Sequence, residues 1–86
     1  MNEKVYSVVN VYDCGRGMGE CATFTDYSSA AQFARSCVHS WVAAMPEDYN
    51  GYLAVIRYSK GQSFYFGDQL LKITPNGEEF EAEGDK

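Results

Sequence analysis

The most regular pattern along the chain is a series of apolar residues that recur at spacings of three and four. The series consists of Ala30, Phe33, Ala34, Cys37, Val38, Trp41, Ala44 and Met45. Such spacing places the apolar side chains on one face of an amphipathic helix. Thr25 or Asp26 can cap the helix by accepting backbone N–H bonds, and Pro46 cannot continue it. We therefore predict a helix over residues 27–45.

Segments rich in β-branched and aromatic residues flank this helix and are separated by turn residues. The predicted strands cover residues 4–12, 20–25, 52–58, 63–66 and 69–74, with Phe80 in a short final strand. A single helix can cover only one face of the resulting sheet. We predict an α+β fold with the order β-β-α-β-β-β, in which one long helix packs on an antiparallel sheet of four to five strands. Residues 1–80 form a single domain, and residues 81–86 form an acidic, flexible tail.

Alternation within the strands predicts what each sheet face carries, because successive side chains point to opposite sides. In the third strand, for example, Leu53 and Val55 oppose Tyr52, Ala54, Ile56 and Tyr58. The arrangement that puts valines, leucines and phenylalanines under the helix leaves five tyrosines on the uncovered face. These tyrosines are Tyr6, Tyr12, Tyr52, Tyr58 and Tyr65.

A face rich in tyrosine is typical of a protein interface, because each ring offers a large apolar area with a polar tip. The surface would serve a foreign partner or a second copy of the chain. Tyrosine is also a common strand residue that tolerates half-exposure, so an ordinary strand role remains an alternative.

Charge favours a basic partner over a nucleic acid. The chain of 86 residues has a net charge of −5, but residues 78–86 alone carry five acidic side chains against one lysine. The remainder is nearly neutral, and a negative chain repels phosphate. Acidic residues in or next to the predicted loops are candidates to contact a Lys/Arg-rich protein surface: Asp13, Glu20, Glu47 and Asp48. For the acidic tail three interpretations stay open: a phosphate mimic, a lure for such a surface, or a solubilising end.

Enzyme chemistry finds little support in the sequence. The glycines at positions 15, 17 and 19 precede a predicted strand, whereas a phosphate-binding loop precedes a helix. Cys37 and His39 lie two positions apart on a helix, so their side chains point about 200° apart and form no dyad. Their spacing to Cys14 and Cys21 lacks the close cysteine pairs of structural zinc sites. We expect a non-catalytic protein without a metal or cofactor.

Composition gives two further expectations about location. No apolar run approaches the roughly 20 residues of a membrane-spanning helix, and the first residues do not resemble a signal peptide. An odd number of cysteines without a CxxC pair then favours reduced thiols. A cytoplasmic protein without a membrane association is expected. Cys14 and Cys21 could still face each other across the first hairpin.

The layout of the chain resembles the small phage-encoded anti-CRISPR proteins. A first hairpin leads through Phe24-Thr25-Asp26-Tyr27-Ser28-Ser29-Ala30-Ala31-Gln32-Phe33-Ala34 into the helix, and more strands and an acidic end follow. This resemblance implies a non-catalytic inhibitor, acting in an infected or lysogenic bacterial host. Its partner would be a CRISPR effector whose DNA-binding or nuclease-recruitment surface it occupies. The alternatives are a homodimerising regulatory or structural domain and a module that stacks single-stranded nucleic acid on the tyrosine face.

Overall fold

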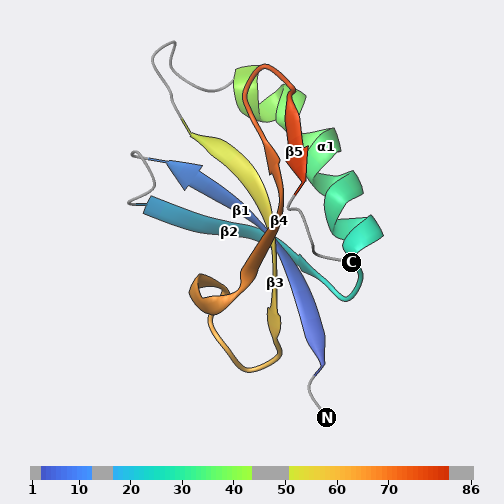
Figure 1. Cartoon of the computed structure of the whole chain (residues 1–86). Helices are drawn as coiled ribbons and strands as arrows, with labels where there is room; N and C mark the ends of the chain where they lie inside the picture. The colour runs from blue at the N-terminus through green and yellow to red at the C-terminus, as the bar shows by residue number, and fades with distance from the viewer. Residues whose placement is uncertain (1–2, 13–16, 44–50, 82–86) are drawn as a thin grey trace.

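The computed structural model describes residues 3–12, 17–43 and 51–81, and confirms the predicted α+β fold. Its elements in chain order are β1 (Lys4–Tyr12), β2 (Gly17–Phe24), α1 (Tyr27–Ala43), β3 (Tyr52–Ser59), the 3-10 turn η2 (Phe64–Phe66), β4 (Asp68–Ile73) and β5 (Glu79–Glu81). The five strands form one sheet in the order β2-β1-β3-β4-β5, and every neighbouring pair is antiparallel. Figure 1 shows the strands fanning out as the sheet twists.

Strand pairing in the described part of the sheet is irregular at two places. In β2 an extra residue, Cys21, separates the partners of Val8 and Val9, which are Ala22 and Glu20. A second shift lies between β3 and β4. An extra residue of this kind bends a strand and increases its twist. It also shifts the alternation of side chains by one position, so that Glu20 and Ala22 point to opposite sides of the sheet.

The helix α1 begins where the sequence predicts. The Ser29 N–H donates to Asp26 Oδ2 at 2.8 Å, so Asp26, rather than Thr25, is the N-cap. The small side chains of Ala30, Ala31 and Ala34 are buried against the sheet and allow a close approach. The helix is described to Ala43, and the predicted stop at Pro46 lies outside the described residues.

A first core lies between α1 and the sheet, and we call it the helix-side core. Its buried members are Val8, Ala30, Ala31, Ala34, Val38, Leu53, Val55, Leu71 and Ile73. As alternation predicts, the apolar residues of one parity in β3 and β4 all lie beneath the helix. Tyr6, Phe24, Tyr27, Phe33 and Cys37 pack around its border.

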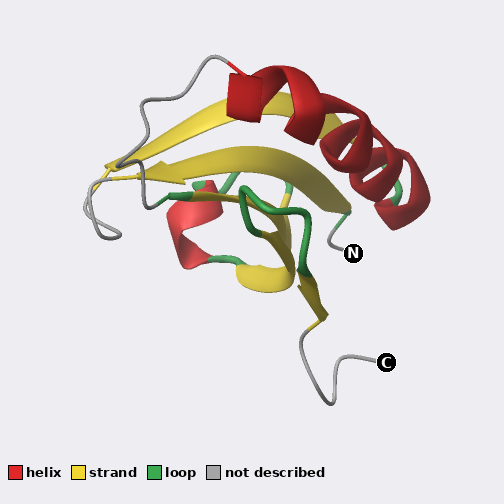
Figure 2. Ribbon diagram, turned by 90° about the horizontal axis from the view of Figure 1, so that it is seen from above, coloured by secondary structure: helices red, strands yellow, loops and turns green. Residues whose placement is uncertain are grey.

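A second core lies on the opposite side of the sheet, where the sequence predicts an uncovered face. It buries Val9, Val11, Ala54 and Ile56, and Met18, Tyr52, Tyr58 and Phe64 pack against it. The prediction that Val9 and Val11 lie under the helix is wrong, because β1 is apolar on both of its faces. Residues 63–66 form no strand; they fold into η2, which covers part of this side of the sheet (Figure 2).

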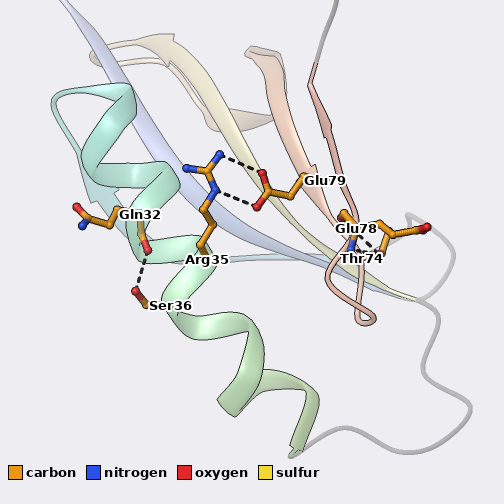
Figure 3. Close-up of polar contacts among 6 residues, drawn as sticks. All are labelled: Gln32, Arg35, Ser36, Thr74, Glu78 and Glu79. Carbon is orange, nitrogen blue, oxygen red and sulfur yellow. Dashed lines mark hydrogen bonds and ion pairs between the residues drawn. The ribbon is translucent and has the colours of Figure 1, made fainter.

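The short strand β5 confirms the prediction for Phe80 and is attached to α1. The turn before it contains Gly77, whose φ of 91° favours glycine, and the Thr74 N–H donates to the Glu78 carbonyl oxygen at 2.9 Å. Arg35 of α1 donates to both carboxylate oxygens of Glu79 (Figure 3). This contact links the helix to the far edge of the sheet.

Candidate protein-binding surface

The η2 segment is a hydrogen-bonded turn, and we refer to Phe64–Phe66 as the aromatic turn. The Ser63 hydroxyl accepts from the Tyr65 N–H at 3.2 Å, which caps the start of the turn. The Phe66 N–H donates to the Ser63 carbonyl at 3.1 Å, and the Gly67 N–H donates to the Phe64 carbonyl at 3.0 Å. Three successive backbone N–H groups are thus satisfied, and the turn has a defined conformation.

Two contacts fix the aromatic turn to the sheet. Phe64 is half-buried in the second core, and its ring stacks on Tyr65 with 4.7 Å between the centroids. Gly67 lies so close to β3 that a Cβ atom would meet the Arg57 carbonyl oxygen at 2.4 Å. Its φ of −93° is open to any residue, so close packing, not backbone conformation, requires glycine here.

The other two rings of the aromatic turn face solvent. Phe66 is 81% exposed and Tyr65 is 62% exposed, more than the other exposed large hydrophobic side chains in the described part of the chain. Aromatic residues of this kind dominate the energetics of protein interfaces. A fixed turn also loses little conformational entropy on binding. The aromatic turn is therefore the best-supported contact surface in the described part of the molecule.

Two of the five predicted tyrosines do not lie on the face opposite the helix. Tyr6 borders the helix-side core and packs edge-on against Tyr27 with 6.4 Å between the ring centroids. Because the alanines of α1 bring little volume, there is room for a large ring beside the helix. Tyr12 shares the parity of Tyr6, and its ring lies over Gly17 of the neighbouring strand. The prediction for both placements is wrong.

The remaining three tyrosines, Tyr52, Tyr58 and Tyr65, lie on the side of the sheet opposite α1 or on the turn that covers part of it. Tyr52 and Tyr58 project from β3 to that side, but both are half-buried against the second core rather than laid open. Tyr65 belongs to the aromatic turn and not to a strand. The prediction that the phenylalanines lie under the helix is wrong for Phe66, which is the most exposed large hydrophobic side chain among the described residues. The flanking Ser63 and Gly67 are the sequence signals that could have revealed the turn.

Glu20, predicted to contact a partner, lies on the same side of the sheet within a group of hydroxyls. Its Oε2 atom accepts from Thr23 Oγ1 at 2.8 Å, from the Tyr58 hydroxyl at 3.1 Å, and from the Ser7 hydroxyl. Ser7 is fully buried, whereas Glu20 itself is exposed. The hydrogen bond from Ser7, followed by that from Thr23, lowers the pKa of the Glu20 carboxyl. The group is therefore an ionised carboxylate held in one orientation.

Lys72 occupies the other end of this side of the sheet. Its Nζ lies 4.6 Å from the centre of the Tyr52 ring and 5.8 Å from that of Phe80, which is 49% exposed. An ammonium group over aromatic faces is a cation–π contact. Lys72 thus covers part of the faces of the Tyr52 and Phe80 rings.

Several candidate residues fall outside the described part of the chain. These are Asp13, Cys14, Glu47 and Asp48, together with the side chain of His39. Cys21 and Cys37 are free thiols, and burial raises the pKa of Cys21. Among the described residues no group of three or more His, Cys, Asp or Glu side chains is arranged to hold a metal ion. The glycines at 17 and 19 lie within strand β2 and do not lead directly into a helix, as the glycines of a phosphate-binding loop do.

No described helix has the length and apolar character needed to cross a bilayer. Comparison of the chain with protein-family models, with curated proteins and with solved structures gives no match. Its function must therefore be argued from its own surface.

Proposed function

We propose that this chain is a non-catalytic protein inhibitor that binds a host nucleic-acid-handling protein complex through its aromatic turn. The observation that carries the proposal is the exposure of Phe66, at 81%, on a turn whose backbone and base are fixed. A monomeric protein gains no stability from an apolar ring in that position. Burying Phe66 and Tyr65 in a partner would remove both rings from water.

The charge of the chain supports a basic surface on the partner. The net charge is −5, and the side chain of Asp68, immediately after Gly67, is exposed although it pairs with Arg57 at 3.3 Å. Glu20 is a second exposed carboxylate and lies on the side opposite α1, which carries the aromatic turn, whereas Asp68 pairs with Arg57 on the helix side of the sheet. Opposite charges around an apolar contact accelerate association and exclude wrong partners.

A CRISPR effector is the partner proposed for this inhibitor, on the basis of the resemblance in size, layout and acidity. Proteins that handle nucleic acids carry Lys/Arg-rich surfaces, and an acidic inhibitor can compete for such a surface. In this proposal the chain blocks DNA binding or nuclease recruitment. It uses only binding, and no residue is assigned to catalysis.

The test is a binding assay between this chain and purified CRISPR effectors of the host, measured at low and at high ionic strength. We expect affinity that weakens as salt is added, and loss of DNA binding or cleavage by the effector at one equivalent of the chain. Binding that leaves both effector activities intact would contradict the inhibitor. Absence of binding to every effector type would contradict a CRISPR partner.

A second candidate function, homodimerisation, rests on the same exposed rings. Two aromatic turns could bury one another across a two-fold axis. Sedimentation of the free chain distinguishes the two candidates, because the inhibitor is expected to be a monomer before it meets its partner. The nucleic-acid alternative is less favoured, since Tyr52 and Tyr58 are half-buried against the second core.

A further inference from the structure

Glu20 is an exposed carboxylate whose orientation is fixed by hydroxyl donors. All three of its hydrogen bonds come from hydroxyl groups and end on one oxygen, Oε2. Among the described residues, none donates a hydrogen bond to the second oxygen, Oε1. An ionised carboxylate with one satisfied and one available oxygen is an acceptor for an external donor.

The extra residue in β2 creates this arrangement. Glu20 and Thr23 are three positions apart, so in a regular strand they would face opposite sides of the sheet. Cys21 is the additional residue, and it brings both side chains to the side that carries Ser7. Extra residues in strands often serve to redirect a side chain in this way.

Tyr58 connects the carboxylate with the aromatic turn. Its hydroxyl donates to Glu20, and its Cβ lies within 2.9 Å of the point where a Cβ on Gly67 would stand. One residue thus extends from Glu20 to the base of the turn that presents Tyr65 and Phe66. The carboxylate therefore lies about one tyrosine side chain away from the base of the turn.

From this geometry we infer that Glu20 is a preorganised receptor for an arginine side chain of the partner. The inference rests on the proposed function, since it names the partner group that meets this surface. Surface ion pairs are usually weak because two long side chains must be immobilised. Here three hydroxyls have already immobilised one of them. Guanidinium suits the site better than ammonium because it is more weakly hydrated and presents several N–H donors in one plane to a carboxylate oxygen.

The inference can be tested on the isolated chain with N-acetyl-arginine amide as the probe and N-acetyl-lysine amide as the matched cation. The readout is the displacement of backbone amide NMR signals during titration. We expect arginine to shift signals around Ser7, Glu20 and Thr23 and to bind more tightly than lysine. Glu20→Gln, which preserves shape and removes charge, should weaken arginine binding about tenfold.

Two further variants separate preorganisation from charge alone. Thr23→Val removes one of the hydroxyl donors and should weaken arginine binding about threefold, because the carboxylate becomes more mobile. Glu81→Gln removes an exposed carboxylate on β5 and should leave binding unchanged. Equal losses in Glu20→Gln and Glu81→Gln would overturn the inference, as would shifts that map elsewhere or equal affinity for lysine. None of these results bears on the aromatic turn, which is tested separately by the binding of a Phe66 variant to a protein partner.

Discussion

Arg35 of α1 donates two hydrogen bonds to Glu79 of β5, from Nε to Oε2 at 2.9 Å and from Nη2 to Oε1 at 3.0 Å. This pair joins the helix to the strand at the far edge of the sheet (Figure 3). β5 has only three residues, all exposed, and it is also held by its pairing with β4, by the contact between Phe80 and Lys72, and by the attraction between Arg35 and Glu81. We therefore expect the ion pair to add to the stability of β5 against local opening.

Glu79→Gln should release β5 more than it destabilises the domain. Both side chains are partly exposed to solvent, so the loss in unfolding free energy should be about 0.5 kcal/mol. Hydrogen exchange of the β5 amides should accelerate, because fewer contacts oppose local opening. Glu78→Gln, an exposed carboxylate directly before the strand, is the control and should change neither quantity. Unchanged exchange in Glu79→Gln would show that pairing with β4 alone holds the strand.

The same pair predicts how stability depends on pH. The hydrogen bonds from Arg35 lower the pKa of Glu79 below its ordinary value of 4.5, and those from Ser7 and Thr23 do the same for Glu20. A carboxyl whose pKa is lower in the folded state stabilises the fold above pH 4.5, and this stabilisation is lost as the pH falls through the folded pKa. The urea concentration at the unfolding midpoint should therefore decrease once the pH is lowered below about 4.5. In the double variant Glu20→Gln, Glu79→Gln this decrease should be less steep. Equal slopes in both proteins would contradict the assignment.

Gly67→Ala should destabilise the domain because the new methyl group meets β3. The closest atom, the Arg57 carbonyl oxygen at 2.4 Å, belongs to the backbone and cannot move aside alone. Overpacking of this kind costs about 1–3 kcal/mol. Gly19→Ala is the control, since a Cβ there has no neighbour within 4 Å. Urea unfolding of the two variants should differ clearly, and a neutral Gly67→Ala would mean that the aromatic turn is not seated against β3.

Ile56→Ala tests whether the side opposite α1 is a true core. Ile56 is only 3% exposed although it shares its face with Tyr52 and Tyr58. Truncation of a buried isoleucine costs about 2–5 kcal/mol, and Leu53→Ala beneath the helix should cost a similar amount. A loss in Ile56→Ala far below that in Leu53→Ala would indicate an open sheet face.

The sequence predicts the element types and their order, because helical spacing and strand alternation are local properties. It predicts α1 well, since Asp26 and the apolar residues at spacings of three and four are all visible in the chain. It predicts poorly which face the helix covers. Alternation shows that Val8 opposes Val9, yet both are buried, and only the packed structure shows that Val8 lies under the helix.

The candidate site was less accessible to prediction, for two physical reasons. Residues 64–66 are aromatic and by propensity favour a strand. They form a turn instead, because Ser63 caps it and Gly67 packs closely against β3. The grouping of Glu20 with Thr23 depends on the extra residue at Cys21, and nothing in the spacing reveals where a strand admits one. Glu20 itself was identified as a contact residue, but by its charge and not by its hydroxyl neighbours.

The central claim, that the aromatic turn binds a protein partner, is tested most directly by the affinity of Phe66→Ser for a purified effector that binds the unmodified chain. Phe66→Ser should unfold at the same urea concentration as the parent, because the ring is exposed, and bind at least tenfold more weakly, as expected for an interface hot spot. Phe80→Ser, at the other end of the same side, is the matched control and should bind within about twofold of the parent. Unchanged affinity in Phe66→Ser, or an equal loss in Phe80→Ser, would contradict the account.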